Sequence, residues 1–325
     1  MDSRVIAVDL GGTQIRAAVC DAEGRVLNRL AQPSQTSEGV EAVFARIVAT
    51  IRAAADEWAH VRAIGIGAPG PLDPWRGIVL EAPNVGGMRD FPLKARLEQE
   101  LGVPVFVGND ANLAALGEQR YGAGRGVANL IYLTISTGIG GGIIADGKLF
   151  LGARGFAGEV GHQTLDVNGP RCNCGNLGCF EALAAGPAIA RAALQAIRAG
   201  RETMMRAQVA GAGAPLTAKI VAEAARAGDP LAREILDRAG FYIGLGLVSL
   251  LHSFDTQLFV LGGGIAIHAW DLIYPQMAAT FGEYAMPSMR QGVAIVPAQL
   301  GDDAGLLGAA ALASEQIAAA PNASA

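Results

Sequence analysis

The sequence predicts an α/β protein of two domains in which one arrangement of strands and turns occurs twice. A chain of 325 residues is long for a single core, so two domains are the default expectation. Short β-rich runs that end in glycine turns alternate with segments whose apolar residues recur at helical spacing. Two segments both read as strand, small-residue turn and strand, which suggests an internal duplication: DLGGTQIRAAV at 9–19 and TISTGIGGGII at 134–144.

The elements of the first part of the chain follow from apolar runs and from the glycines and prolines that end them. Strands are expected at residues 5–8, 15–20, 25–30, 61–67 and 103–107. Helices are expected at residues 40–55, 92–101 and 111–121. Three strands followed by a helix is therefore the opening pattern.

From residue 129 this arrangement begins again. Strands are expected at residues 130–135, 139–145, 257–261 and 293–296. Alanine-rich residues 188–227 read as helical, and further helices are expected at 270–281 and from 302–304 to about 318.

Asp229 and Pro230 predict the start of a long helix, because an N-cap side chain stands before a first-turn proline. This helix is apolar all round in its C-terminal part and is expected to be buried. Residues 319–325, the end of the sequence, are expected to be a frayed tail.

Composition excludes several classes of protein. Hydrophobic residues make up 51% of the chain and charged residues 17%, which is typical of a packed globular protein rather than a disordered one. The net charge of −5 gives no reason to expect nucleic acid or an anionic membrane as a partner. No secretory signal is visible, and the apolar run 241–251 is too short and glycine-rich to span a membrane. Clustered cysteines fit a reducing cytoplasm.

The most informative stretch is residues 159–181, which contains His162, Cys172, Cys174 and Cys179. One imidazole and three thiolates can supply the four ligands of a closed tetrahedral Zn²⁺ site, which indicates a structural metal rather than a catalytic one. The alternative is a set of reduced buried cysteines beside an unrelated histidine. Two carboxylates, Glu159 and Glu181, bracket this stretch and would form a polar wall if the metal holds the loop.

Three glycine turns follow predicted strands and favour a site for a polyphosphate. Glycine lets backbone N–H groups approach phosphate oxygens, and an adjacent threonine adds a donor. The turns are Gly11-Gly12-Thr13, Thr137-Gly138 with 140–142, and 262–264. A hairpin turn explains any single one of them. The pattern G-x-G-x-x-G at 65–70 is discounted because prolines stand where a helix should open, and no P-loop motif occurs.

Two aspartates stand at strand ends beside these turns. Asp110, in the sequence Gly108-Asn109-Asp110, is either the N-cap of the following helix or a general base, and can be both. Asp9 precedes the first turn and is a candidate to hold Mg²⁺ directly or through water.

Together, these motifs resemble those of the ROK family of bacterial sugar kinases, and most of all its ATP-dependent glucokinases. The resemblance runs from DLGGT at residue 9 to DDAGLLGAA at residue 302, and its most specific parts are GEVGH and CNCGNLGCFE. It implies an actin-like, ribonuclease H-like fold with two lobes and an inserted zinc loop. The implied reaction is ATP-dependent phosphorylation of a hexose, most of all glucose, at its 6-hydroxyl.

The resemblance also implies roles for individual residues. Asp110 would be the catalytic base, and the residues around the sugar would be Asn84, Asn109, Asp110, Glu159, His162 and Glu181. The ATP phosphates would be lined by Gly11, Thr13, Thr137, Gly138 and Gly263, and Asp9 and Gly12 complete the expected cofactor-binding residues. His162 would bind zinc through one nitrogen and a sugar hydroxyl through the other. One departure from the family is the run Ala182–Ala185, where a serine often follows the glutamate.

Several expectations remain open at this point. N-acetylmannosamine, N-acetylglucosamine and fructose kinases of the same family are alternatives to a glucokinase. Sugar-responsive repressors share the zinc motif, but the first strand begins within a few residues of Met1 and no basic segment precedes it. The expected lobes are 1–117, to which helix 302–318 returns, and 118–300 with the zinc loop. They should close on the ligands, and a homodimer or higher homo-oligomer is the family's common arrangement.

Overall fold

The computed structural model describes residues 4–55, 58–206 and 215–319. The chain divides into two compact units, and it passes between them four times. The first unit comprises Met1–Gly126, Gly142–Gly158 and Gln299–Ala325. The second unit comprises Val127–Gly141 and Glu159–Ala298. The predicted tail, 319–325, lies outside the described residues except for Ala319, which ends the last helix.

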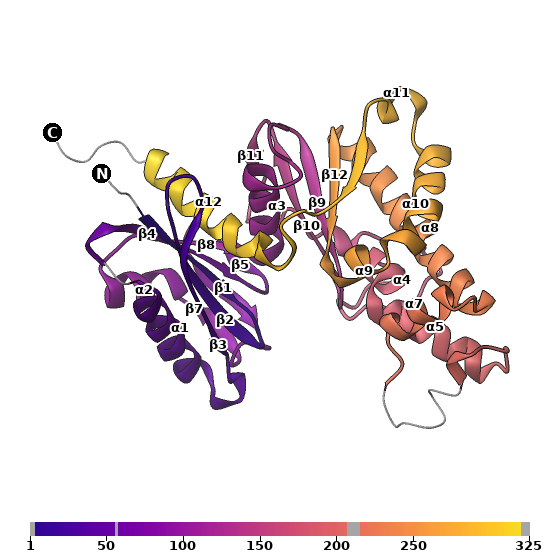
Figure 1. Cartoon of the computed structure of the whole chain (residues 1–325), viewed down its shortest axis with the longest axis horizontal. Helices are drawn as coiled ribbons and strands as arrows, with labels where there is room; N and C mark the ends of the chain where they lie inside the picture. Colours follow the sequence, from indigo (N-terminus) through magenta and orange to yellow (C-terminus); the bar gives the residue numbers. More distant parts are fainter. Residues whose placement is uncertain (1–3, 56–57, 207–214, 320–325) are drawn as a thin grey trace. The chain divides into compact units, whose positions relative to one another are not determined.

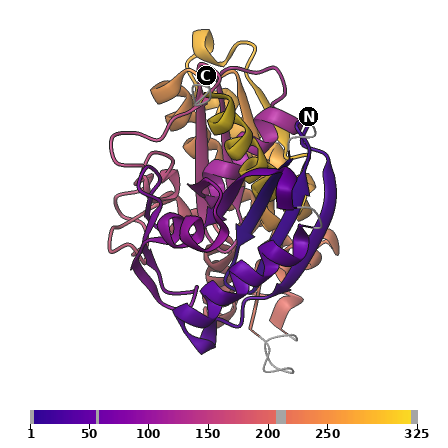
Figure 2. The ribbon, with the colours of Figure 1, turned by 90° about the vertical axis from the view of Figure 1, so that its left-hand side faces the viewer.

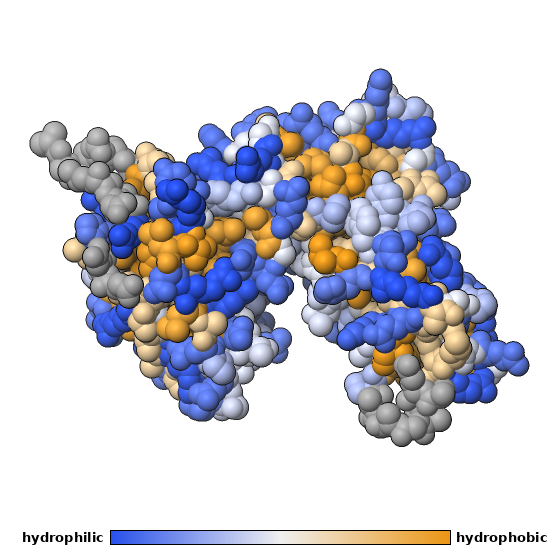
Figure 3. All heavy atoms as spheres, viewed as in Figure 1, coloured by the Kyte–Doolittle hydropathy of each residue, from blue (hydrophilic) through white to orange (hydrophobic). Residues whose placement is uncertain are grey.

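The first unit is built on a five-stranded sheet with the order β3-β2-β1-β4-β8. Strands β1, β2 and β3 pair antiparallel, whereas β1, β4 and β8 pair parallel. The strands are β1 (Arg4–Leu10), β2 (Gln14–Cys20), β3 (Val26–Pro33), β4 (Val61–Ala68) and β8 (Val105–Asn109). The edge strand β3 carries exposed Val26, Leu27 and Leu30, and Figure 3 shows apolar surface among charged side chains on this unit.

Helices cover both faces of this sheet, because successive strand residues point to opposite sides. Ile6 and Val8 of β1 join a core with α1 (Val40–Ala54) and α2 (Leu93–Leu101). Val5 and Ala7 join a second core with α3 (Asp110–Tyr121) and α12 (Ala304–Ala319). Figures 1 and 2 show α1 and α12 on opposite sides of the sheet. Short 3₁₀ turns precede three of these elements: η1 (Thr36–Glu38), η2 (Trp58–His60) and η4 (Gly301–Asp303).

Helix α12 packs closely on the sheet and on α3 because glycines remove side chains from the contacts. A Cβ atom at Gly65 of β4 would lie 1.9 Å from the Ala309 carbonyl oxygen. A Cβ atom at Gly308 would lie 1.7 Å from the Leu113 carbonyl oxygen of α3. Neither position can therefore accept a larger residue without moving the helix.

A small second sheet in the first unit was not predicted from the sequence. Its antiparallel strands are β5 (Leu72–Asp73), β6 (Ile78–Ala82) and β7 (Met88–Phe91). These strands are too short to show a clear alternation of apolar and polar residues. The connection between β6 and β7 carries Asn84, one of the predicted site residues.

A second five-stranded sheet has the order β11-β10-β9-β12-β13, which repeats the plan of the first. Its strands are β9 (Leu130–Ile135), β10 (Ile139–Ala145), β11 (Lys148–Leu149), β12 (Leu258–Gly262) and β13 (Ala294–Pro297). Strand β9 pairs parallel with β12, and β12 pairs parallel with β13. In the same way, β1 pairs parallel with β4 and β4 with β8 in the first sheet. The boundary between the units falls inside β10. The predicted duplication is thus present in the strand order.

The second unit also contains helices. They are α4 (Phe180–Ala184), α5 (Gly186–Arg198), α7 (Ala218–Arg226), α8 (Pro230–Phe254), α9 (Gly263–His268), α10 (Trp270–Tyr284) and α11 (Pro287–Arg290), with the 3₁₀ turn η3 (Val160–His162). As predicted, Asp229 caps α8, its side chain accepting a hydrogen bond from the Ala232 N–H at 3.0 Å. The predicted helical segment 188–227 is interrupted, and part of it lies outside the described residues.

Helix α8 has the length and composition of a membrane span. Of its most apolar 18-residue window, 61% is buried inside the structure, which is the behaviour of a core helix. Among the described residues, no other helix meets the same criteria.

Buried Glu118 of α3 holds together two separate backbone segments of the first unit. Its Oε2 atom accepts a hydrogen bond from the Ala123 N–H at 2.8 Å. Its Oε1 atom accepts hydrogen bonds from the N–H groups of Gln299 at 2.9 Å and Leu300 at 2.8 Å. The Glu118 side chain is fully buried, so no water can accept these hydrogen bonds if the carboxylate is removed. Glu118 thereby ties the end of α3 to the chain that leads into α12.

We predict that Glu118→Gln lowers the free energy of unfolding by about 2 kcal/mol, because an amide replaces one accepting oxygen with a donor that faces a backbone N–H. Thermal unfolding followed by circular dichroism measures the effect as a lower Tm. Glu23→Gln is the matched control, since the Glu23 side chain is 69% exposed and pairs with Arg25 at the surface. Equal Tm values for the two variants would contradict this role of Glu118.

Candidate functional site

The predicted site residues fall into two groups, one in each unit. The first unit holds Asp9, Gly11, Gly12, Thr13, Asn84, Asn109 and Asp110. The second unit holds Thr137, Gly138, Glu159, His162, Cys172, Cys174, Cys179, Glu181 and Gly263.

In the first unit, the two aspartates lie at the same edge of the sheet. Asp9 of β1 is in register with Gly67 of β4, and Gly67 is in register with Gly108 of β8. The carboxyl ends of these three parallel strands therefore meet, and Asp110 begins the helix that follows β8. An open α/β sheet binds ligands at this edge.

The Asp9 carboxylate is held by a neighbouring guanidinium. Its Oδ2 atom accepts hydrogen bonds from Arg16 Nε at 3.0 Å and Arg16 Nη2 at 2.5 Å. Its Oδ1 atom lies beside Gly67 and Gly305, since a Cβ atom at either glycine would stand 3.8 or 3.7 Å away, respectively. Arg16 thus fixes the orientation of the carboxylate and leaves Oδ1 on the side without a guanidinium.

The first glycine turn is fixed by Ser34, a residue that sequence reasoning did not single out. The buried Ser34 hydroxyl donates to the Gly11 carbonyl at 2.6 Å, and the Ser34 N–H donates to the Thr13 carbonyl at 2.9 Å. Asn84 lies against the same turn, because a Cβ atom at Gly12 would be 2.9 Å from the Asn84 carbonyl oxygen. The structure therefore brings Asn84 and the first turn together.

Asn109, and not Asp110, is the N-cap of α3. The Asn109 Oδ1 atom accepts hydrogen bonds from the N–H groups of Ala111 at 3.0 Å and Asn112 at 3.3 Å. Asp110 is the first residue of the helix, and its Oδ1 atom accepts from the Ala111 N–H at 2.8 Å. The N-cap reading of Asp110 was wrong because asparagine caps a helix as well as aspartate does. Asp110 is exposed at the helix start.

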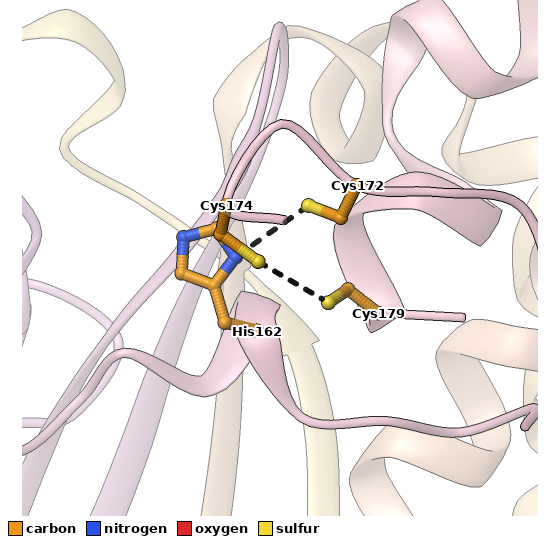
Figure 4. A group of neighbouring side chains, drawn as sticks. All are labelled: His162, Cys172, Cys174 and Cys179. Carbon is orange, nitrogen blue, oxygen red and sulfur yellow. Dashed lines mark hydrogen bonds between the residues drawn. The ribbon is translucent and has the colours of Figure 1, made fainter. Parts of the chain in front are cut away.

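In the second unit, His162, Cys172, Cys174 and Cys179 converge as predicted (Figure 4). Their ligand atoms all lie within 4.8 Å of one another. The Sγ atoms of Cys174 and Cys179 are 3.6 Å apart, and Cys172 Sγ is 3.8 Å from His162 Nδ1. A tetrahedral Zn²⁺ ion with Zn–S bonds of about 2.3 Å separates its sulfur ligands by about 3.8 Å. The donor set and its spacing therefore fit a closed zinc site.

The thiols of this cluster have different surroundings. Burial, reinforced by the neighbouring thiols, raises the pKa of Cys179 to about 12. A hydrogen bond from the Asn176 backbone lowers the pKa of the exposed Cys174 thiol. A buried thiolate at Cys179 accordingly needs a cation beside it.

His162 presents its two ring nitrogens to different partners. Nδ1 faces Cys172, whereas Nε2 lies 4.0 Å from Glu159 Oε2. A metal bound at Nδ1 would leave Nε2 as the nitrogen that carries a proton, directed toward the Glu159 side.

The second and third glycine turns lie side by side in the second unit. Gly263 has φ of 84°, and a Cβ atom there would lie 2.6 Å from the Ile135 carbonyl oxygen at the end of β9. Both the backbone conformation and the close approach therefore require glycine. Thr137 and Gly138 follow directly in the turn between β9 and β10.

A pocket of about 840 Å³ opens beside these two turns, entirely within the second unit. It has a predominantly apolar floor with charged groups among its lining, a combination suited to an aromatic base with polar substituents. The lining residues are Ser136, Thr137, Gly186, Pro187, Ala190, Leu216, Thr217, Ala218, Lys219, Ala222, Glu223, Arg226, Gly264, Ile265, His268 and Ala269. Sequence reasoning pointed only to the two turns, at Thr137 and at Gly264, since most of the others are ordinary helix residues from separate segments.

The paired five-stranded sheets, with glycine turns at the ends of their first strands, define the actin-like ATPase fold, as predicted. The chain belongs to the ROK family, whose family model matches residues 5–316. This confirms the family that the zinc-loop and glycine-turn motifs indicated.

Relatives of known name cover nearly the whole chain. A glucokinase from Halalkalibacterium halodurans is 36% identical over 97% of this chain and 96% of its own. An N-acetylmannosamine kinase from Escherichia fergusonii is 32% identical over 95% of this chain and 97% of its own.

Two solved structures are similar over a comparable length. A ROK hexokinase from Thermus thermophilus is 39% identical, with a TM-score of 0.86 over 98% of this chain and 100% of that chain. A ROK family glucokinase from Streptomyces griseus, in complex with glucose and AMPPNP, is 39% identical, with a TM-score of 0.79 over 96% and 100%.

We predict that the purified protein contains about one zinc ion per chain and that Cys174→Ala loses most of it, because three remaining ligands cannot close a tetrahedral site. Elemental analysis by mass spectrometry gives the metal content, and thermal unfolding gives the accompanying loss of stability. Cys20→Ala is the control, since Cys20 is buried in the core of the first unit and should leave the zinc content unchanged. A wild-type protein without zinc would refute the structural-metal assignment.

Proposed function

We propose that the protein is an ATP-dependent sugar kinase that transfers the γ-phosphoryl group of ATP to the 6-hydroxyl of a hexose, with glucose as the preferred substrate. The observation that carries the proposal is the pocket beside the two glycine turns of the second unit, which suits the base and ribose of a nucleotide. Support comes from the similarity to glucokinases over nearly the whole chain.

We assign the nucleotide to the three glycine turns, two in the second unit and one in the first. The adenosine occupies the pocket, and its phosphates lie near Thr137, Gly138 and Gly263, where glycine lets backbone N–H groups approach phosphate oxygens and the threonine hydroxyl adds a donor. Gly11, Gly12 and Thr13 of the first unit are the remaining proposed phosphate ligands. Asp9 is proposed to hold Mg²⁺ through Oδ1, directly or through water, and the ion neutralises phosphate charge when bound.

The sugar is assigned to polar side chains that suit a polyol. They are Asn84, Asn109 and Asp110 of the first unit, and Glu159, His162 and Glu181 of the second. In this proposal zinc is structural, and its ligands orient His162 so that Nε2 serves the sugar.

Asp110 is the proposed catalytic base. A sugar hydroxyl is too weak an acid to ionise before it reacts, so a carboxylate within hydrogen-bond reach orients it and accepts its proton as the bond to phosphorus forms. Asp110 suits this task because it is exposed at the carboxyl edge of the sheet while the capping role belongs to Asn109.

The proposal also covers the cellular compartment, the partners and the assembly of the enzyme. Four reduced cysteines, three of them in the metal cluster, fit a reducing cytoplasm. The negative net charge suits small-molecule substrates rather than nucleic acid. A homodimer or higher homo-oligomer is the proposed assembly, on the family resemblance alone.

Steady-state kinetics with ATP test the substrate assignment. We expect the highest kcat/KM for glucose in a panel with mannose, fructose, N-acetylglucosamine and N-acetylmannosamine. N-acetylmannosamine kinase is the second candidate, because a relative of that name is 32% identical. A higher kcat/KM for N-acetylmannosamine than for glucose would select that candidate, and no turnover of any sugar would reject the kinase proposal.

We predict that Asp110→Asn folds, still binds glucose and loses at least about 10²-fold in kcat, because an amide cannot accept the hydroxyl proton. Isothermal titration with glucose separates binding from turnover. Asp90→Asn is the matched control, because Asp90 is exposed and its φ of 46° is one that asparagine adopts readily. Near-normal turnover by Asp110→Asn would remove Asp110 from the role of base.

A further inference from the structure

The turn between β9 and β10, residues 136–139, is held in place by the segment that carries the metal ligands. Glu181 lies two residues after Cys179, and its Oε2 atom accepts a hydrogen bond from the Ile139 N–H at 3.0 Å. The same carboxylate packs on the turn itself, since a Cβ atom at Gly138 would lie 2.5 Å from Oε2. The side chain of Glu181 therefore occupies the space immediately beside the backbone of the turn.

Two further contacts from the same segment restrain the turn from other directions. The backbone of Gly161 lies against the carbonyl of Ile139, because a Cβ atom at Gly161 would be 1.9 Å from that oxygen. The Gly186 N–H donates to the Ser136 carbonyl at 2.8 Å. Residues on both sides of the cysteines thus bind the two ends of the turn.

Glu181 has little freedom to adjust, because its neighbours are fixed. Its other oxygen, Oε1, lies 3.9 Å from Cys172 Sγ in the metal cluster. The preceding residue, Phe180, is fully buried, and its N–H donates to the Gln163 carbonyl at 2.8 Å. A Cβ atom at Gly246 of α8 would be 2.6 Å from the Phe180 ring, so the ring packs directly on that helix.

The restrained turn forms one wall of the large pocket. Ser136 and Thr137 line this pocket, and so does Gly186, the residue that donates to Ser136. A displacement of the turn would move the hydroxyl of Thr137 and the backbone N–H groups beside it. The carboxylate of Glu181 is therefore placed between the metal cluster on one side and the nucleotide pocket on the other.

We propose that Glu181 is a positioning residue for the nucleotide turn and that it couples the metal cluster to nucleotide binding. This inference rests on the proposed function, which assigns ATP to the pocket. It differs from a role for Glu181 toward the sugar alone, because the contacts that fix the turn exist without any sugar. Glu181 acts through the backbone of residues 138 and 139 and does not touch the nucleotide.

The test is the affinity for Mg²⁺-AMPPNP, measured by isothermal titration on the zinc-loaded enzyme with no sugar present. Glu181→Ala should weaken binding about tenfold, the loss expected for one hydrogen bond to a charged group that positions several donors. Glu181→Gln should be weakened less, because its amide oxygen can still accept from the Ile139 N–H. Glu234→Ala, which removes an exposed carboxylate paired with Arg201, should bind like the wild type.

Zinc affinity provides a second measurement. Coupling between two sites is reciprocal, so saturating AMPPNP should tighten zinc binding in the wild type and much less in Glu181→Ala, as measured by competition with a chelator. Wild-type AMPPNP affinity in folded Glu181→Ala, with zinc retained, would overturn the inference. If Glu181→Ala does not fold, two results together would overturn the inference. Glu181→Gln would bind AMPPNP and respond to zinc like the wild type, and removing zinc from the wild type would leave its AMPPNP affinity unchanged. A wild-type enzyme that does not bind AMPPNP would instead overturn the proposed function.

Discussion

Four ligand atoms within 4.8 Å of one another are the constraint on which the functional part of the second unit depends. Three thiolates at this spacing repel one another unless a cation lies between them, so a bound metal would hold the loop in this shape. The shape of the loop sets the direction of three groups. The Glu181 carboxylate faces Ile139, His162 Nε2 faces Glu159, and the Gly186 N–H faces Ser136. A short irregular loop thereby positions groups that would otherwise need a larger core.

The loops of the first unit are held in place without a metal. Buried polar side chains tie its loops to neighbouring backbone: Glu118 accepts three N–H groups, and Ser34 holds both ends of the first glycine turn. Arg16 orients Asp9 in a comparable way. The two sheets share a strand order, but the elements inserted between their strands differ, and each unit fixes its glycine turn with whatever its own insertions supply.

Local patterns in the sequence were sufficient for most of the fold. Strands β9 and β10 were predicted with their observed limits, and Asp229 was correctly predicted as the cap of α8, because alternation and capping are local effects. The ligand cluster was also visible, since its residues are close in sequence. The pocket was not, because its walls come from α5, α7 and α9, whose residues show nothing unusual until the fold brings them together. Ser34 was missed for the same reason, and the strands β5–β7 were missed because they are too short to show a clear pattern.

The packing of α12 on β1, β4 and α3 has a consequence for synthesis on the ribosome. Leu306, Ala309, Ala310 and Ala313 complete the core that contains Val5, Ala7 and Ala63. Those residues of α12 are translated only after the whole second unit, through Ala298, has been made. Until then only α3 packs on this face of the first sheet, the part that α12 covers is exposed, and a nascent chain in this state is a target for chaperones. The unit whose strands emerge first is therefore the one whose core closes last.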